Sequence, residues 1–214
     1  DIPQLDGKIH VPFGVFSPLR GEYLDLISQT PLAPNIQTAF DIGTGSGVIA
    51  AILAKRGIPD IIATDTNPKA IACATANLKR LGLDKAVNIQ SIDLFPKSCA
   101  DLIVCNPPWL PAKPTSAIET ALYDPNHAML TAFLNGVRKH LNPNGEAWLI
   151  ISDLAEHLHL RDKDFLNQCF QTASLNVVDI LKTKPQHKKA IDESDPLAFA
   201  RNKETTYLYR LKAI

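Results

Sequence analysis

The sequence of 214 residues lacks several patterns that would point to particular classes of protein. Its four cysteines form no Cys-x-x-Cys pair, and its six histidines form no His-Glu-x-x-His pattern. A zinc site or a disulfide framework is therefore not expected. No apolar run approaches the roughly 20 residues that span a bilayer, and no signal peptide is visible. We therefore expect a cytoplasmic protein with no membrane partner.

An excess of charge of either sign is also lacking, because 22 Lys and Arg balance 22 Asp and Glu. Zero net charge argues against a broad basic face for nucleic acid, although it is compatible with a local patch. The apolar content of 45% is ordinary for a globular protein, so the chain is expected to bury a full core. The chain begins at Asp1 rather than at a methionine, which agrees with a piece of a longer protein.

Strand and helix patterns alternate along most of the chain. We predict strands ending at residue 42 and at 61–64, 87–92, 102–105, 147–151, 175–181 and 205–211. We predict helices at about 47–56, 68–81 and 127–141, the last closed by Asn142-Pro-Asn-Gly145, and one ending near 170. The alternation implies right-handed βαβ units, and the last two strands pair antiparallel or lie at an edge. The predicted fold class is α/β, a Rossmann-like, mostly parallel sheet flanked by helices.

Residues 1–35 differ from the rest of the chain, because they carry Pro and Gly first and then a short helical pattern over 23–27. We interpret 1–35 as an N-terminal arm with one helix and 36–214 as the main domain. The apolar segment Val11–Phe16 is suited to lie over a pocket or to pack into the core. A long polar loop, 182–203, carries a basic run that is interpreted as a solvated loop rather than a phosphate contact.

The chain is organised around a buried strand that leads into Asn106-Pro107-Pro108-Trp109. The prolines fix φ and keep the residues before them extended, so the direction of the Asn106 amide is restricted. Its side-chain oxygen and the Pro107 carbonyl are predicted to be free acceptors for a planar NH2 group. Trp109 is suited to stack on a flat substrate. The alternative interpretation is an ordinary proline-rich turn.

A glycine-rich turn, Asp41-Ile-Gly43-Thr44-Gly45-Ser-Gly47, comes after the first strand. Glycines let the backbone bend and let a ligand approach it, and the helix start beyond offers free N–H groups. The third glycine of the dinucleotide pattern would fall at Val48. This spacing disfavours a nicotinamide cofactor without excluding it.

Acidic residues end the next two strands. Asp65 stands where a carboxylate accepts both hydroxyls of a ribose, and the alternative is a helix N-terminal cap. Asp93 is predicted to accept from an adenine amino group, and the alternative is a loop acid. In an open α/β sheet the carboxyl ends of the strands meet at the ligand-binding edge. Polar groups at four successive strand ends therefore indicate a nucleoside site.

Four segments resemble class I S-adenosylmethionine-dependent methyltransferases. They are Asp41–Gly47, Ala63–Ala70, Asp93–Pro96 and Asn106–Trp109. More narrowly, they are similar to the branch that methylates amino groups and carries an Asn-Pro-Pro-aromatic motif. That branch includes the HemK-like release-factor glutamine methyltransferases and the ribosomal RNA guanine methyltransferases of the methyltransferase small type. The motifs are specific for the reaction class but not for the substrate.

The resemblance implies S-adenosyl-L-methionine as the cofactor and no metal. It implies that the glycines surround the methionine part, with Asp65 on the ribose and Asp93 near the adenine. The cofactor residues that it implies are Asp41, Gly43, Thr44, Gly45, Gly47, Asp65, Thr66, Asp93, Leu94 and Asn106. The residues that it implies for the acceptor nitrogen are Asn106, Pro107 and Trp109.

The reaction implied is methyl transfer to a planar NH2 nitrogen, and a glutamine side-chain amide in a protein is preferred. An apolar rim of Phe13, Phe16, Trp109 and Leu110 favours such a peptide substrate. The alternative is the exocyclic amine of a base in ribosomal RNA, because a flipped base stacks well on Trp109. An NAD(P)-dependent oxidoreductase and an inactive binding module are remote alternatives. Trp109 departs from the motif of the glutamine methyltransferases, because those enzymes typically carry Tyr at this position.

Overall fold

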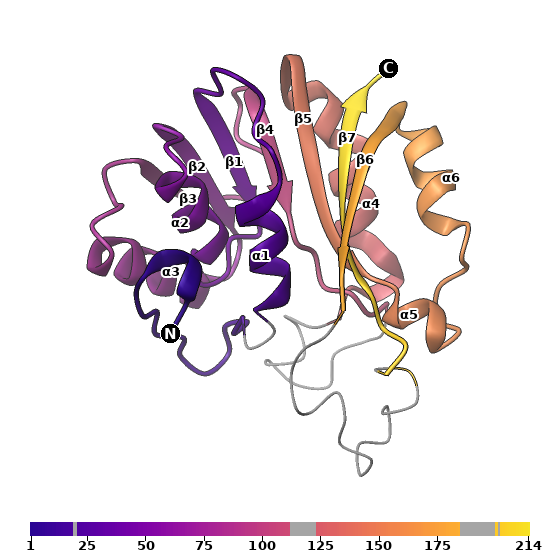
Figure 1. The fold of residues 1–214 in the computed structure, drawn as a ribbon, viewed down its shortest axis with the longest axis horizontal. Coiled ribbons are helices and arrows are strands. Elements are labelled where there is room, and N and C mark those ends of the chain that lie inside the picture. The colour runs from indigo at the N-terminus through magenta and orange to yellow at the C-terminus, as the bar shows by residue number, and fades with distance from the viewer. Residues whose placement is uncertain (19–20, 112–122, 185–199, 201) are drawn as a thin grey trace.

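Seven strands form one sheet in the order β3-β2-β1-β4-β5-β7-β6 (Figure 1). The structure is a computed structural model that describes residues 1–18, 21–111, 123–184, 200 and 202–214. The strands are β1 (Thr38–Ile42), β2 (Asp60–Asp65), β3 (Val87–Ser91), β4 (Ala100–Cys105), β5 (Leu141–Ser152), β6 (Leu175–Thr183) and β7 (Thr206–Ala213). All neighbours pair in parallel except β7, which is antiparallel to β5 and β6. The predicted α/β fold class is confirmed.

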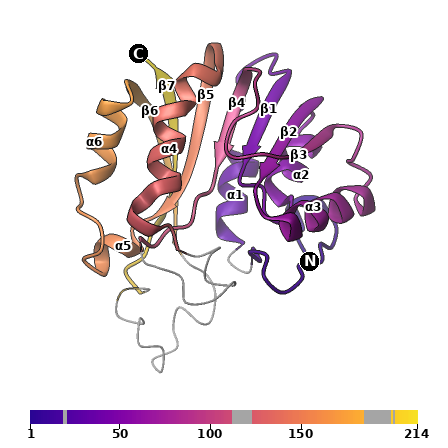
Figure 2. The ribbon, with the colours of Figure 1, turned by 180° about the vertical axis from the view of Figure 1, so that it is seen from behind.

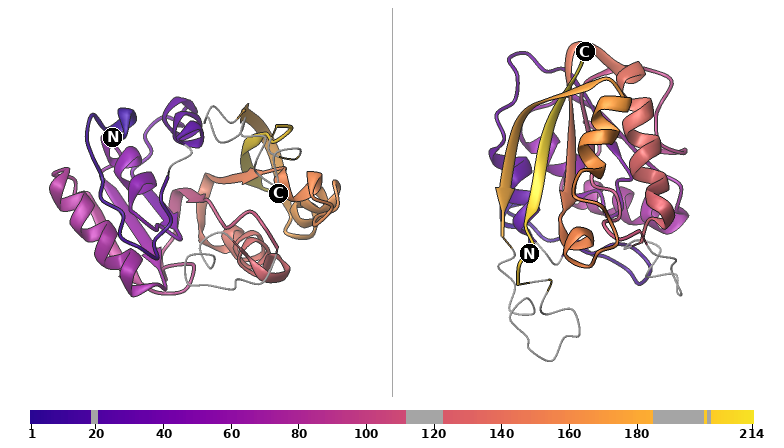
Figure 3. Two further views of the ribbon diagram at one scale, coloured as in Figure 1. Left: turned by 90° about the horizontal axis from the view of Figure 1, so that it is seen from below. Right: turned by 90° about the vertical axis from the view of Figure 1, so that its right-hand side faces the viewer.

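Helices cover both faces of the sheet (Figures 2 and 3). One core contains side chains of α1 (Glu22–Gln29), α2 (Val48–Lys55) and α3 (Pro68–Arg80), and the other contains those of α4 (Ala128–Val137) and α6 (Phe165–Thr172). The short elements are η1 (Pro3–Leu5), η3 (Pro125–His127), η4 (Arg138–His140) and α5 (Leu154–His157). Among the described residues, no helix is long and apolar enough to cross a membrane.

The central strands carry continuous apolar runs, such as Leu102–Cys105 in β4, because both faces of the sheet are covered. In β4, Leu102 and Val104 enter the core on the side of α1 and α2, whereas Ile103 and Cys105 enter the core on the side of α4. Side chains of a strand alternate between the two faces, so a strand buried on both sides reads as a continuous apolar run. This is why the strand before Asn106 is readable from the sequence.

The predicted end of the fourth helix was wrong. Asn142–Gly145 does not close that helix but lies within β5, which starts at Leu141. The Asn142 side chain donates to Asp101 Oδ1 at 2.8 Å, and the register between β4 and β5 shifts at Ala100 to Leu102. A Cβ at Gly145 would lie 3.1 Å from the Asp101 carbonyl oxygen. The tetrapeptide therefore forms an irregular start of the strand against β4.

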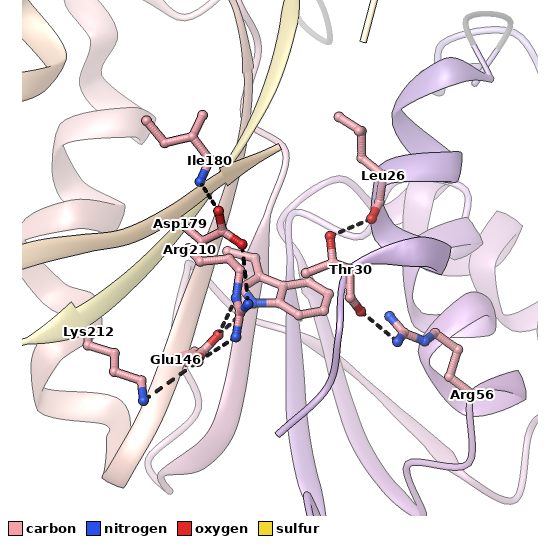
Figure 4. Close-up of polar contacts among 9 residues, drawn as sticks. Leu26, Thr30, Arg56, Glu146, Asp179, Ile180, Arg210 and Lys212 are labelled. Atoms are coloured by element: carbon pink, nitrogen blue, oxygen red, sulfur yellow. Dashed lines mark hydrogen bonds and ion pairs between the residues drawn. The ribbon is translucent and has the colours of Figure 1, made fainter. Parts of the chain in front are cut away.

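Arg56 fastens the C-terminal end of α1 (Figure 4). Its guanidinium donates to the carbonyl oxygen atoms of Ile27 and Thr30, the latter at 2.6 Å. It also lies 5.9 Å from the centre of the Trp148 ring on β5. The last carbonyl groups of a helix lack partners within the helix, so this one cation both caps α1 and joins it to the sheet.

A second polar network ties the last strands together on the same face (Figure 4). Glu146 on β5 accepts two hydrogen bonds of 2.9 Å from Arg210 on β7, and Lys212 Nζ lies 3.7 Å away. Arg210 also approaches Asp179 on the edge strand β6 at 3.5 Å. The pair between Arg210 and Glu146 is bidentate and mostly buried, which restricts geometry more than a single exposed ion pair would.

Replacing Arg56 by methionine should lower the free energy of unfolding by about 1.5–3 kcal/mol, the range for hydrogen bonds that involve a charged group. Urea denaturation of wild type and Arg56→Met measures this. Arg138→Met is the matched control, because the exposed Arg138 side chain makes one hydrogen bond with the described part of the chain, to the carbonyl oxygen of the terminal residue Ile214. Equal losses in the two variants would contradict a specific role for Arg56.

Candidate functional site

A cavity of about 530 Å³ lies at the carboxyl ends of β1, β2, β3 and β4. This volume is in the range of small-molecule sites, and the location is the usual ligand edge of an open α/β sheet. The predicted residues that line it are Gly43, Thr44, Gly45, Asp65, Thr66, Asp93, Leu94, Asn106, Pro107 and Trp109. The structure thus brings most of the predicted site together. Asp41 and Gly47 are not among the described residues of its wall.

Asp41 lies beneath the glycine-rich turn rather than in the cavity wall. Its Oδ2 accepts from Thr44 Oγ1 at 2.6 Å and from the backbone N–H of Ala50 at 3.0 Å. Burial raises the pKa of Asp41 to about 6, and those two hydrogen bonds partly oppose the rise. Its Oδ1 is buried with no hydrogen-bond partner in the described part of the chain. Asp41 thus supports the turn, and the cofactor contact expected of it stays a prediction.

The third glycine of the turn serves helix packing. Gly47 has φ 80°, and a Cβ there would lie 3.0 Å from Ala74 Cβ and 3.1 Å from Ala74 Cα. Only glycine allows α2 to approach α3 this closely at a positive φ. The expectation that Gly47 surrounds the methionine part of the cofactor stays a prediction. Gly43, by contrast, stands in the cavity wall with φ 71°.

Asp65 is held in the wall by backbone donors. Its two carboxylate oxygens accept from Gly45 N–H at 3.0 Å and from Asn67 N–H at 2.8 Å. The N-terminal cap of α3 is Asn67, whose side chain accepts from the backbone of Lys69. The alternative interpretation of Asp65 as that cap is therefore wrong. Because each carboxylate oxygen has a further lone pair, Asp65 keeps acceptor capacity for a ligand.

The loop after β3 closes one side of the cavity. Asp93 is exposed and lines the cavity, two residues after β3 ends at Ser91. Leu94 has φ 51°, and its carbonyl oxygen accepts from Thr64 Oγ1 at 2.7 Å. This bond ties the loop to β2, next to Asp65. The adenine contact of Asp93 stays a prediction.

Asn106 comes directly after β4, and its side-chain oxygen already has a donor. The indole N–H of Trp109 donates to Asn106 Oδ1 at 2.9 Å. The prediction that this oxygen is free was therefore wrong, because the chain through Pro107 and Pro108 brings the indole back onto the amide. Trp109 is half-buried and packs against both cores of the sheet. These packing contacts consequently restrict the position of the indole ring.

Tyr23 is a site residue that the sequence interpretation missed. It comes from α1, is only 1% exposed and lines the same cavity. Burial raises the pKa of Tyr23 strongly, nearby Asp41 and Glu22 add to the rise, and a hydrogen bond with the Asn106 side chain opposes it. The sequence showed only a short helix here. A Tyr within the apolar stripe of that helix was the one available signal.

The segment before α1 also reaches the cavity. Gly14, Val15 and Phe16 line it, which confirms the expectation that this apolar stretch lies over a pocket. Phe13 does not belong to the predicted rim, since it is 76% exposed and lines a separate groove.

Asp124 is a second missed residue of the wall. It is buried, and its carboxylate accepts from the backbone N–H groups of Met129 and Leu130 at 2.9 and 3.0 Å. Its own N–H donates to the Leu110 carbonyl oxygen at 2.7 Å. An Asp followed by Pro before an apolar helix is a typical N-terminal capping pattern, so composition offered a signal here.

Two further predictions concern charge and metals. Within the described ranges, no three His, Cys, Asp or Glu side chains form a group able to hold a metal ion. The predicted loop 182–203 with its basic run begins too early, because β6 continues to Thr183, and both Lys182 in the strand and Lys184 after it are exposed. The remaining members of that run, His187, Lys188 and Lys189, lie outside the described residues.

Comparisons with known proteins match this architecture. The model of the methyltransferase small domain family matches residues 8–180. A release factor glutamine methyltransferase of Cereibacter sphaeroides is 34% identical over 137 residues, which are 58% of this chain and 49% of the relative. A tRNA1(Val) (adenine(37)-N6)-methyltransferase of Cytophaga hutchinsonii is 30% identical over 133 residues, 58% and 56% of the two chains. The chain spans about half the length of these relatives.

Among solved structures, a geranyl diphosphate methyltransferase in complex with SAM superposes with a TM-score of 0.65. The alignment covers 90% of this chain and 85% of that chain at 10% identity. At this identity the likeness concerns the fold alone. It agrees with the strand order described above.

The buried carboxyl of Asp41 should make stability depend on pH. Its pKa of about 6 exceeds the unfolded value of about 3.9, so the folded state retains the proton between these values. Stability from this group is complete below pH 4 and is lost as the pH rises to 6 and above. From pH 4 to 7, wild type should lose about 2–3 kcal/mol relative to Asp41→Asn, which does not titrate.

Urea denaturation of both proteins at pH 4, 5, 6 and 7 measures this difference. Other carboxyl groups titrate in both proteins, so their contributions cancel. Asp60→Asn, at the exposed start of β2, is the matched control and should show a constant difference from wild type. A constant difference for Asp41→Asn as well would mean that folding does not raise the pKa of Asp41.

Proposed function

Because this chain belongs to the methyltransferase small domain family, we propose that it is an S-adenosylmethionine-dependent N-methyltransferase. The comparisons confirm the resemblance that the motifs predicted. One observation carries the proposal: Asn106-Pro107 lies in the wall of the same cavity as Gly43, Gly45 and Asp65. A site for a nucleoside cofactor and a pair of acceptors for an amino group therefore share one space.

The cavity fits S-adenosylmethionine. The Asp65 carboxylate, fixed by Gly45 and Asn67, is suited to accept from the ribose hydroxyls. Ile92 and Leu94 give an apolar wall beside exposed Asp93, which suits an adenine ring with its amino group. When bound, this cofactor supplies a methyl group activated by a sulfonium centre. Membership of the methyltransferase small domain family supports the assignment.

The chain's own part in the reaction is to hold the acceptor nitrogen. The nitrogen of an amide or a ring amine is a poor nucleophile because its lone pair is delocalised. We propose that the Asn106 oxygen and the Pro107 carbonyl oxygen accept its two N–H groups, favour a pyramidal nitrogen and stabilise the positive charge that develops. Alignment of the reacting atoms in this way is worth up to about 7–11 kcal/mol. A nicotinamide-dependent reaction would leave Asn106 without a role.

The arm belongs to the catalytic unit in this proposal. Residues 36–214 are proposed as the methyltransferase domain and 1–35 as its N-terminal arm. The family match begins at residue 8, and Gly14–Phe16 and Tyr23 of the arm line the cavity. The arm therefore contributes to the site as well as leading into the fold.

We propose a glutamine side-chain amide in a protein as the substrate, such as a translation factor in the cytoplasm. A release factor glutamine methyltransferase is among the relatives at 34% identity, net charge is zero, and Phe16, Trp109 and Leu110 form an apolar wall. The second candidate is the exocyclic amine of an RNA base. It is favoured by the tRNA adenine relative at 30% identity and by the flat Trp109 ring.

Asp65→Asn should weaken S-adenosylhomocysteine binding by about 1–3 kcal/mol, because a charged acceptor to the ribose is lost while the side chain keeps its shape. Isothermal titration calorimetry measures this affinity. Asp60→Asn, at the other end of the same strand, is the control and should bind as wild type does. Unchanged affinity in Asp65→Asn would remove the ribose assignment.

The substrate is tested by transfer of a tritiated methyl group to an extract of cells lacking the enzyme. Label that is lost on protease treatment and survives ribonuclease is expected for a protein glutamine. Label with the opposite sensitivity would replace protein by RNA and leave the reaction class intact. Asn106→Ala is the control enzyme, and its transfer should fall about 100-fold or more because its contact strengthens as the nitrogen becomes positive. S-adenosylhomocysteine affinity of this variant should stay near that of wild type.

A further inference from the structure

The Asn106 amide has two chemically opposite ends. The oxygen only accepts hydrogen bonds, and the NH2 group only donates. A half-turn about the last side-chain bond exchanges them, with almost no change in shape. In the proposed reaction only one orientation works, since the other would set donor hydrogens against the donor hydrogens of the substrate. Something in the site must therefore choose between the two.

Trp109 supplies that choice on one side. Its indole N–H can donate but cannot accept, and it lies 2.9 Å from Asn106 Oδ1. A flipped amide would place its NH2 group against this N–H, so the indole selects the orientation with the oxygen toward Trp109. The ring itself is held because it packs against both cores. A carbonyl oxygen has two lone pairs, so one remains for a substrate N–H.

Tyr23 supplies the choice on the other side. It is only 1% exposed and lines the same cavity as Asn106, and hydrogen bonding with the Asn106 side chain lowers the pKa of Tyr23 against the larger effect of burial. When the Asn106 oxygen faces the indole, the Asn106 NH2 group is directed so that it can donate to the hydroxyl oxygen of Tyr23. In the described part of the chain, the side-chain oxygen and nitrogen atoms of Tyr23 and Asn106 are not among the buried polar atoms that lack a hydrogen-bond partner. Tyr23 is itself fixed, since α1 lies in the core and Arg56 caps its end.

We propose that Trp109 is a positioning residue that locks the Asn106 amide with its oxygen directed for catalysis, assisted by Tyr23 in the same cavity wall. The inference rests on the proposed function and adds to it a reason for Trp at position 109. A Tyr or Phe ring there would keep a flat surface for stacking but would offer no N–H at this place. In this chain the ring both faces the cavity and sets the amide.

A spectroscopic test needs no substrate. The chain has two tryptophans, so the indole N–H region of a nitrogen-15 proton spectrum holds two signals. Asn106→Ala should move the Trp109 signal toward that of a free indole. The Trp148 signal, whose N–H donates to Glu146 Oε2 at 3.2 Å, should stay in place and so report an intact fold. Tyr23→Phe should also shift the Trp109 signal, because the amide loses its second partner.

A kinetic test separates donation from stacking. Trp109 is replaced by benzothienylalanine, in which sulfur stands for the N–H and ring size is kept. This variant and Tyr23→Phe should lose kcat by about 10- to 100-fold, the range for a misplaced catalytic group, while KM and S-adenosylhomocysteine affinity stay within about twofold. The double variant should lose less than the product of the two losses, since both act on one amide.

Tyr207→Phe is the matched hydroxyl control, because its hydroxyl lies 3.4 Å from Asp153 and away from Asn106. Two results would overturn the inference. One is a Trp109 signal that does not move in Asn106→Ala, and the other is a sulfur variant in which KM rises while kcat is unchanged. If the wild-type enzyme transfers no methyl group, the proposed function fails. The spectra then still decide whether the indole and the hydroxyl hold the amide.

Discussion

The parallel pairing of β1 with both β2 and β4 is the constraint on which the site depends. Ile42 lies opposite Thr64 on one side and opposite Cys105 on the other. The next residues along each strand, Gly43, Asp65 and Asn106, therefore emerge next to one another at a single edge. Segments more than 60 residues apart in the sequence are joined by this register alone. A slip of one residue in either pair would turn the flanking side chains to the opposite face.

Register explains why so much of the fold was readable in the sequence. Strands buried on both faces appear as continuous apolar runs, and each is followed by a polar residue at the ligand edge. Those two signals together located Asp65 and Asn106. Asn142–Gly145 misled because its composition is typical of a turn, whereas its contacts with Asp101 make it the start of β5. The local composition favours a turn, but the strand pairing that forms in the folded sheet overrides this preference.

The errors within the site share one physical origin. Motif spacing marked which residues lie near the ligand edge, but not which way each side chain is used. Asp41 supports the turn from beneath, and Gly47 makes room for Ala74 of α3. Tyr23 lines the same cavity as Asn106 but comes from α1, a helix that precedes every strand of the sheet in the sequence. These roles are contacts between elements distant in sequence, so no pattern within one segment could reveal them.

The arm and the acceptor motif are mechanically connected through α1. Arg56 holds the C-terminal end of that helix against the sheet, and Tyr23 near its start lines the same cavity as Asn106. One helix packed in the core therefore joins the arm to the wall that carries the acceptor motif. Phe16, a few residues earlier, lines the same cavity. Residues on both sides of the boundary predicted at residue 35 thus line one cavity. The arm and the sheet build this wall together, so the site is incomplete without either.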